Sequence, residues 1–528
     1  MTAEEKTLKK RLPSYVMLCF FAAFNVCFYM PMDIYIPNAN DIEIPIKPFA
    51  ACLGIVTLAV FAAALLICLL TKGRANRIFR AALFGVSAAF YIQGSFLAAN
   101  MGVLNGERYA PPLWRSALSI VVWLAVLTAA FIILWKLPEE FDGLVSYIAG
   151  AVFIVQIIAL GISAYSSIPK YDLEQLNYIL EGESISYCSA KDIELYSKNK
   201  NLIVFVADEY DSFLFDNSME EAPESLSEFD GFTYYTNTVG KYDLTEPSIA
   251  YLTSGGAYGK QYRNMTFFKN AAENFKANFY TSTTIPPASV TGQYCDNVGT
   301  VSLSLGDVML YSKDVYRLAF FRCMPELVKP LFMVDGSDIG GELKKLLEKR
   351  VEAELDTTLY SYDDLEFYNN LPRELTTTDE NVFKFIYILG VHSPRTVTKD
   401  FEQTVKEVSP EDEAIVVNKI VNEYLKILKE NGVYDNSEII FMADHGLTGH
   451  LEKKFPMLMY KPAHQTETGI TISNAPISYD DMFPTLIKLT GGEPQARTIF
   501  DIAEDEERVR YFGDDDREVI VNAKLAYN

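Results

Sequence analysis

A stretch near the C-terminal end of the chain, FMADHGLTGH (residues 441–450), holds two of the four histidines of the whole sequence. An apolar run ends there in Asp444 and His445, a glycine follows, and His450 comes five residues after His445. A carboxylate and an imidazole side by side are typical ligands of a divalent ion such as Zn²⁺ or Mn²⁺. An Asp-His-Gly sequence also fits a strand that ends in a tight turn, so this motif alone leaves both interpretations open.

Two other apolar runs end in residues of the same chemical kind. NLIVFVADEYD (201–211) reaches Asp208, and FKFIYILGVHS (383–393) reaches His392. In an open parallel sheet, polar residues just past the carboxyl ends of the strands are where sites form. The coincidence of three strand ends therefore predicts a metal site more strongly than any one residue does.

A candidate nucleophile lies in YDLTEPSIAYLTSGG (242–256), where Thr245 precedes Glu-Pro-Ser and an apolar helical run. Thr followed by Pro within the first turn is a good helix start, so Thr245 could be only an N-cap. The same position lies in the positive potential of a helix N-terminus, where anions such as phosphate bind. A metal bound to the hydroxyl would lower its pKa and make it a nucleophile.

The elements that must position these residues alternate along the chain. Apolar strands at 201–211, 383–393 and 437–446 are separated by helical stretches, of which 411–432 has apolar residues at helical spacing and a glycine stop. Strand–helix–strand alternation predicts a mainly parallel α/β sheet with helices on both faces.

The first 165 residues have a different character, with apolar stretches that are each close to the ~20 residues a helix needs to cross a membrane. Five such stretches can be marked, at about 13–32, 48–71, 81–99, 116–135 and 143–165. A basic start before the first could indicate a cleaved signal peptide, but four further apolar runs argue against that. We expect an all-α domain of about five transmembrane helices.

Basic residues flank alternate ends of these stretches, which sets the expected orientation. They lie before the first span (Lys6, Lys9, Lys10 and Arg11), between the second and third (Lys72, Arg74, Arg77 and Arg80) and after the fourth (Lys136). The N-terminus is therefore expected in the cytoplasm, and five spans would place the rest of the chain outside the plasma membrane.

The expected organisation is a transmembrane domain at 1–165, a linker at 166–199, a catalytic domain at 200–495 and a C-terminal extension at 496–528. The linker is either a plain spacer or a short helix near the membrane surface. RLAFFR (317–322) is an amphipathic helix for which a structural role is favoured over a membrane contact.

The net charge and the cysteine spacing argue against some classes of partner and site. The formal net charge of −23 argues against nucleic acid as a partner, since a phosphate backbone needs a basic surface. The seven cysteines include no C-x-x-C spacing. A disulfide between Cys295 and Cys323 is conceivable in an outside domain but is not favoured.

Taken in order, the motifs resemble the alkaline phosphatase/sulfatase superfamily. NLIVFVADE resembles its first metal strand, TEPSIAYLTSG its nucleophile segment and GVYDNSEIIFMADHG its last metal strand. LGVHSP is similar to the G-x-H-x-P segment of phosphoethanolamine transferases, and APISYDDMFPTLIKLTG (475–491) to a segment that follows the site. The resemblance covers roughly residues 200–495. Five spans before an outside domain match the lipoteichoic acid synthase and phosphoethanolamine transferase branches.

The resemblance implies roles residue by residue. Asp208, Asp444 and His445 would bind a divalent metal, Mn²⁺ or Zn²⁺ with Mg²⁺ as a third option. Thr245 would bind this metal and attack phosphorus. His392 would hold the phosphate or head group or bind a second metal, and His450 is either a substrate contact or an exposed loop residue.

Some positions depart from the patterns of the family. Type I sulfatases need Cys or Ser as nucleophile and Arg four residues later, where this chain has Thr245 and Ile249. The transferase branches usually carry Glu at the place of Asp208, which leaves the branch open. Strand alternation would turn the neighbouring Glu209 away from the metal, so it is not counted as a ligand.

The resulting hypothesis is a membrane enzyme that transfers phosphoglycerol or phosphoethanolamine from a phospholipid to a cell-surface glycan or polymer through a phospho-threonine. The alternatives are a membrane-anchored sulfatase-like hydrolase or phosphodiesterase, and an inactive protein that only binds surface polymer.

Overall fold

The structure is a computed structural model. It describes residues 3–42, 44–98, 111–168, 180, 184–256, 266–281, 294–334, 345, 348, 350–351, 357–447, 454–513 and 518–521. The chain divides into two compact units, a helical one formed by residues 1–185 and 302–347, and an α/β one formed by residues 186–301 and 348–528. Each is described by itself.

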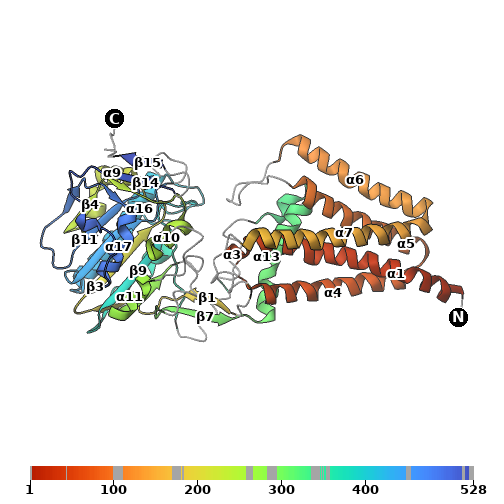
Figure 1. The fold of residues 1–528 in the computed structure, drawn as a ribbon, viewed down its shortest axis with the longest axis horizontal. Helices are drawn as coiled ribbons and strands as arrows, with labels where there is room; N and C mark the ends of the chain where they lie inside the picture. Colours follow the sequence, from red (N-terminus) through yellow and green to blue (C-terminus); the bar gives the residue numbers. More distant parts are fainter. Residues whose placement is uncertain are drawn as a thin grey trace. The chain divides into compact units, whose positions relative to one another are not determined.

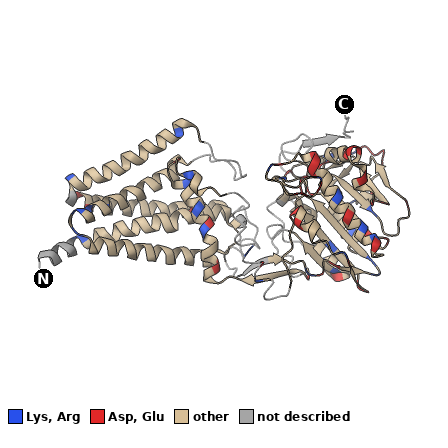
Figure 2. Cartoon of the chain, turned by 180° about the vertical axis from the view of Figure 1, so that it is seen from behind, with Lys and Arg blue, Asp and Glu red and all other residues tan. Residues whose placement is uncertain are grey.

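The helical unit is built from long apolar helices that run alongside one another (Figure 1). Its N-terminal helix is continued by short π, α and 3₁₀ segments: α1 Ala3–Phe24, η1 Asn25–Tyr29, α2 Met30–Tyr35, η2 Ile36–Asn38 and α3 Ala39–Ile42. The others are α4 Ile46–Leu70, α5 Gly73–Ile92 with η3 Gln93–Leu97, α6 Leu113–Lys136, α7 Pro138–Ser167, α13 Leu305–Cys323 and η6 Lys329–Phe332. Figure 2 shows how few charged residues the long helices carry.

Four of the described helices are long and apolar enough to cross a membrane, which confirms a membrane-anchored N-terminal part. They are Arg11–Asn38, Ile46–Leu70, Leu113–Lys136 and Glu140–Ser167. Large apolar side chains such as Leu58, Val121 and Ile162 are exposed on them, as helices that face lipid require.

The structure differs from the five predicted spans at the third one, 81–99. Helix α5 does occupy this place and packs against α1 and α6. It begins at Gly73, however, so Arg74, Arg77 and Arg80 lie inside the helix and not in a loop. These charges reduce the apolar character of α5.

Residues 302–347 belong to the helical unit although they follow the strands of the α/β unit in the chain. Helix α13 contains the RLAFFR segment and packs against α2 and α4. Its Tyr316 hydroxyl donates to the Cys27 carbonyl at 2.8 Å, and Arg322 pairs with Asp33 at 2.9 Å. Local sequence patterns did not predict that this segment joins the helical unit, because it has no apolar run of spanning length.

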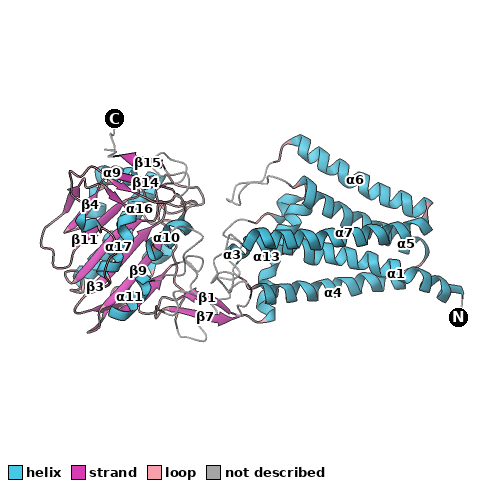
Figure 3. Ribbon diagram, in the orientation of Figure 1, coloured by secondary structure: helices cyan, strands magenta, loops and turns pink. Residues whose placement is uncertain are grey.

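The α/β unit is organised around a seven-stranded mixed sheet in the order β12-β4-β11-β10-β3-β9-β6 (Figure 3). The strands are β3 Asn201–Ala207, β4 Phe232–Tyr235, β6 Lys276–Tyr280, β9 Val382–Ile388, β10 Ser437–Ala443, β11 Leu458–Lys461 and β12 Ile470–Ser473. The three predicted strands are β3, β9 and β10, which are neighbours and parallel. The sheet is mixed because β11 runs antiparallel to β10 and β4.

Helices cover both faces of the sheet, as predicted. They are α9 Ser212–Glu221, α10 Thr245–Ser254, α11 Thr266–Asn274, α15 Asp364–Asn369, α16 Pro410–Glu430 and α17 Met482–Leu489. On one face, the Phe205 ring packs against Tyr424 of α16. On the other, the ring of Phe385 contacts Phe268 of α11. Successive side chains alternate between faces, so the register of β3 and β9 fixes which residues face α10 and α11.

Short strands complete the unit. They are β1 Ser184–Cys188, β2 Leu195–Ser197, β5 Thr238–Val239, β7 Val298–Ser302, β8 Thr376–Thr378, β13 Ile477–Ser478, β14 Val509–Phe512 and β15 Glu518–Val521, with 3₁₀ turns η5 Pro223–Leu226, η8 Tyr479–Asp481 and η9 Ile499–Asp501. Strands β1 and β2 fall in the segment expected as a linker, whose possible helix lies mostly outside the described residues. Cys295 and Cys323 are both buried free thiols, so the structure contains no disulfide between them.

Candidate metal and phosphoryl-transfer site

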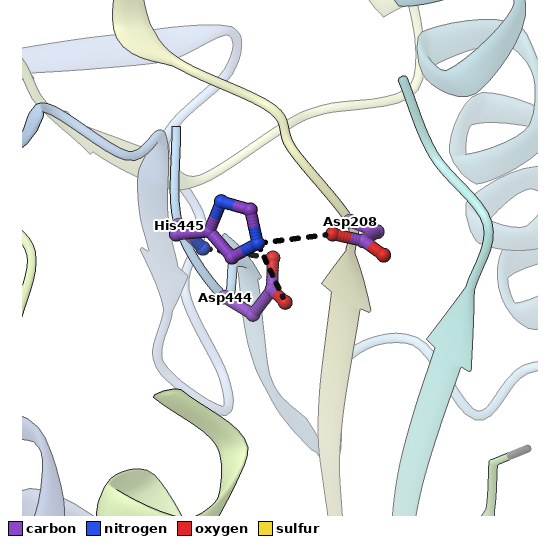
Figure 4. A group of neighbouring side chains, drawn as sticks. All are labelled: Asp208, Asp444 and His445. Carbon is purple, nitrogen blue, oxygen red and sulfur yellow. Dashed lines mark hydrogen bonds and ion pairs between the residues drawn. The ribbon is translucent and has the colours of Figure 1, made fainter. Parts of the chain in front are cut away.

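Three predicted ligands meet where β3 and β10 end. Asp208 follows β3 directly, and Asp444 and His445 follow β10. Because Ala443 pairs with Ala207 in the parallel register, the residues after them leave the sheet side by side. Figure 4 shows the three side chains turned toward one another, and their ligand atoms all lie within 4.8 Å of each other. All three are buried.

The Thr245 hydroxyl reaches the same point from the first residue of α10. Its Oγ1 donates to Asp208 at 3.2 Å and lies 3.3 Å from Nε2 of His445. The N-cap position is held by Leu244, which makes no capping hydrogen bond, so Thr245 is not the N-cap. Its hydroxyl is directed into the cluster of acids and imidazole and not to its own helix.

The hydrogen bonds of the cluster fit a metal ion. Nδ1 of His445 lies 2.8 Å from the Gly446 carbonyl, an acceptor, so Nδ1 carries the proton and Nε2 faces the carboxylates. Oδ1 of Asp444 accepts from the backbone N–H of His445 at 2.7 Å. Oδ2 of Asp444 is buried with no hydrogen-bond partner among the described residues, and it lies 3.6 Å from Nε2. A buried carboxylate oxygen of this kind is satisfied either by a cation or by a proton.

Burial and mutual repulsion shift the acid–base properties of the cluster. Burial, followed by the charge of Asp208, raises the pKa of Asp444 to about 8. Burial alone would lower the pKa of His445, but Asp444 and Asp208 outweigh it, and the pKa of this imidazole is raised. Protons therefore compete with a cation for the same lone pairs.

Two neighbours of the cluster were not predicted. Glu209 is buried in the left-handed region (φ 54°), so strand alternation does not apply to it, and its N–H donates to Asp444 Oδ1 at 3.3 Å. The Tyr387 hydroxyl of β9 donates to Asp208 Oδ2 at 2.5 Å. The sequence shows a tyrosine near the carboxyl end of an apolar strand, but it does not show which strand lies beside it.

The two remaining predicted residues are placed differently. His392 is exposed in the loop after β9, and no contact between it and the cluster is seen in the described residues. His450 lies outside the described residues. The structure thus brings together Asp208, Thr245, Asp444 and His445, while the roles of both other histidines stay predictions.

The loop after β9 nevertheless supports the cluster through its backbone. The N–H of Val391 donates to the Asp208 carbonyl at 2.8 Å, and the N–H of Gly390 donates to Asp364 at 3.1 Å. Gly390 has φ +66°, and a Cβ here would collide with the backbone oxygen and nitrogen of Asp208. This close approach of two backbones requires glycine.

Gly390→Ala is therefore expected to displace Asp208 and weaken metal binding about tenfold or more, in the range seen when groups that orient metal ligands are lost. The measurement is calorimetric titration of the full-length protein with Zn²⁺ and Mn²⁺. The control is Gly432→Ala, where φ is +69° and a Cβ meets no atom within 4 Å. It carries the same backbone strain, about 1–2 kcal/mol, without the collision. Equal metal affinity in both variants would contradict the supporting role of this loop.

The α/β unit also has an open cavity of about 790 Å³, lined by residues such as Lys191, Asp192 and Tyr360. None of the four clustered residues lines it. We place the candidate chemistry at the strand ends, where the ligand atoms converge, and not in this cavity.

A family model described as Sulfatase matches residues 200–492. A comparison with curated proteins finds no match.

Solved structures similar to the chain include two bacterial proteins. Lipoteichoic acid synthase LtaP from Listeria monocytogenes is 12% identical, covers 62% of this chain and 81% of its own, and has a TM-score of 0.35. The periplasmic domain of EptC from Escherichia coli, in complex with Zn, is 12% identical with coverages of 65% and 98% and a TM-score of 0.35. The family assignment rests on the family model and not on these similarities.

Proposed function

The chain belongs to the sulfatase family, and from this premise we propose that it is a metal-dependent membrane phosphotransferase. It moves a phosphoglycerol or phosphoethanolamine group from a phospholipid to an acceptor at the cell surface, through a phosphate ester on Thr245. The superfamily contains both sulfatases and phosphotransferases. We use the identity of the nucleophile, Thr245, to choose between these two activities.

One observation carries the proposal, namely the position of the Thr245 hydroxyl. It lies at the first residue of a helix and hydrogen-bonds both Asp208 and His445. Helix N-termini stabilise anions such as phosphate. A hydroxyl that is aimed at a metal-ligand cluster in positive helix potential suits attack on a phosphodiester.

The proposed reaction proceeds in two steps at this cluster. Oγ1 of Thr245 bonds to the lipid phosphorus, the bond from phosphorus to the glyceride oxygen breaks, and that oxygen leaves with a proton as neutral diacylglycerol. The Thr245 proton departs along its hydrogen bond to Asp208, and its transfer from there supplies the proton that the leaving glyceride oxygen takes up. An acceptor hydroxyl then attacks the same phosphorus, and the Thr245 oxygen leaves and regains a proton.

The donor set of Asp208, Asp444, His445 and Thr245 would hold the divalent ion, with Mn²⁺ and Zn²⁺ as the candidates and Mg²⁺ as a third option. Such an ion neutralises charge on the phosphoryl oxygens and lowers the pKa of the threonine hydroxyl. His392, exposed at the neighbouring loop, would contact the head group, and His450 would contact substrate.

The membrane part supports a lipid donor. Four helices of spanning length and composition would confine the chain to the plane in which a phospholipid diffuses. With α5 as a fifth span and a cytoplasmic N-terminus, the catalytic unit would lie outside the plasma membrane. An acceptor of the glycan or teichoic-polymer type is then accessible there.

The proposal is tested by incubating the full-length protein in detergent with Mn²⁺ or Zn²⁺ and with phosphatidylglycerol or phosphatidylethanolamine. Intact mass spectrometry is expected to show an adduct of one phosphoglycerol or one phosphoethanolamine group, together with released diacylglycerol. An adduct that decays only when a polyol acceptor is added supports transfer, and one that water removes at the same rate supports the hydrolase alternative. Metal-loaded protein that forms no adduct with either lipid would contradict the proposal.

A further inference from the structure

Tyr387 is a buried polar group of the site to which neither the family match nor the proposed reaction gives a role. In the register of the sheet it pairs with Val206, two residues before Asp208, so its ring lies on the same face as the cluster. It is 2% exposed, and its hydroxyl donates to Oδ2 of Asp208 at 2.5 Å.

The hydrogen bond from Tyr387 distinguishes the two oxygens of Asp208. Oδ2 accepts from the phenol and Oδ1 lies 3.5 Å from Nε2 of His445, while the Thr245 hydroxyl lies 3.2 Å from both oxygens. Because the phenol occupies a lone pair of Oδ2, Oδ1 is the oxygen of Asp208 that is more available to a cation beside His445. Asp444 is fixed in a comparable way, because Oδ1 accepts backbone N–H groups from His445 and Glu209 and only Oδ2 remains.

The number of available oxygens determines which ion a site prefers. Two single carboxylate oxygens, one imidazole nitrogen and one hydroxyl make a set of four, which suits Zn²⁺. Calcium takes six to eight oxygen ligands, often with both oxygens of a carboxylate. A site that keeps Asp208 to one oxygen therefore discriminates against Ca²⁺.

From this geometry we propose that Tyr387 sets the metal selectivity of the site by keeping Asp208 a one-oxygen ligand. This assignment rests on the proposed metal-dependent function and names a positioning residue for it. It concerns metal choice and not the phosphoryl transfer itself.

The test compares wild-type protein and Tyr387→Phe, which removes the hydroxyl and keeps the ring. Full-length protein in detergent is stripped with chelator and titrated calorimetrically with Zn²⁺, Mn²⁺ and Ca²⁺. We expect Tyr387→Phe to lower the preference for Zn²⁺ over Ca²⁺ by about tenfold or more, the size of effect that outer groups have on metal affinity. Tyr196→Phe is the matched control, since it removes another buried hydroxyl of the same unit. That hydroxyl is hydrogen-bonded to the Tyr424 hydroxyl at 2.7 Å.

The outcomes distinguish a failure of the proposed metal-dependent function from a failure of the role of Tyr387. A wild-type protein that binds none of the three ions overturns the metal-dependent function and this assignment with it. Wild-type binding with an unchanged Zn²⁺/Ca²⁺ ratio in Tyr387→Phe overturns the role of Tyr387 alone. Equal weakening of all three ions is the signature of structural damage, and it also overturns the assignment.

Discussion

Thr245→Ala is expected to abolish formation of the phosphorylated adduct and to slow turnover at least about a thousandfold, the minimum loss typical when a covalent nucleophile is removed. The hydroxyl is the group of Thr245 that hydrogen-bonds Asp208 and lies 3.3 Å from Nε2 of His445. Alanine keeps the helix start, because the N-cap position is Leu244 and Thr245 makes no capping bond. The variant should therefore fold and still bind metal through Asp208, Asp444 and His445. Intact mass after incubation with the lipid donor measures the adduct, and calorimetry measures the metal.

Thr245→Ser is the matched variant, because it restores a hydroxyl at the same place and loses only a methyl group. We expect it to form the adduct, at a rate lower than that of the wild type but far above that of Thr245→Ala. An adduct that persists in Thr245→Ala would place the nucleophile elsewhere. A loss of metal binding together with the adduct would mean that the threonine is chiefly a ligand.

The sequence predicted the part of the site that follows from strand ends. Asp208, Asp444 and His445 come directly after apolar strands, and the parallel pairing of β3 with β10 brings such ends together. Thr245 was found through its helix start. These features are local in the chain, so they can be recognised without tertiary structure.

Tyr387 and Gly390 could not be found in this way. Tyr387 matters because β9 pairs with β3 in a particular register, which directs its hydroxyl to Asp208. Gly390 matters because its loop touches the backbone of Asp208. Both depend on which strand neighbours which, and this is decided by long-range packing that local patterns do not contain.

The fold, like the site, was predicted where local patterns determine it and missed where long-range packing does. Helical stretches and apolar strands were predicted from their periodicity. The antiparallel strand β11 and the place of residues 302–347 in the helical unit were not. The expected single catalytic range, 200–495, is continuous in sequence, whereas the compact α/β unit is built from two separate ranges.

Asp444→Asn is expected to eliminate measurable metal binding, with a loss of affinity of about a hundredfold or more, because a charged ligand becomes a neutral amide. The same change is expected to stabilise the metal-free protein at alkaline pH. The folded-state pKa of Asp444 is raised to about 8, chiefly by burial and then by Asp208, whereas an unfolded aspartate titrates near 4. A raised pKa means that metal-free wild-type protein loses stability as the pH rises between these two values. Asparagine stays neutral and avoids that loss.

The measurement is the unfolding temperature of both chelator-treated proteins between pH 5 and pH 9, taken as a difference so that other titrating groups cancel. The advantage of Asp444→Asn should be small at pH 5 and grow toward pH 8, and added Zn²⁺ should reverse the order by stabilising only the wild type.

Asp230→Asn is the control, because its carboxyl has a pKa shifted in the opposite direction. The side-chain hydrogen bond from Lys429, and then the Gly469 N–H, lower the pKa of Asp230. This variant should be less stable than the wild type by an amount that stays constant from pH 5 to pH 9, because the lowered pKa of Asp230 lies below that range. A pH-independent difference between Asp444→Asn and the wild type would show that Asp444 is already ionised in the metal-free protein, and its unpaired oxygen would then need a partner other than a proton or a metal.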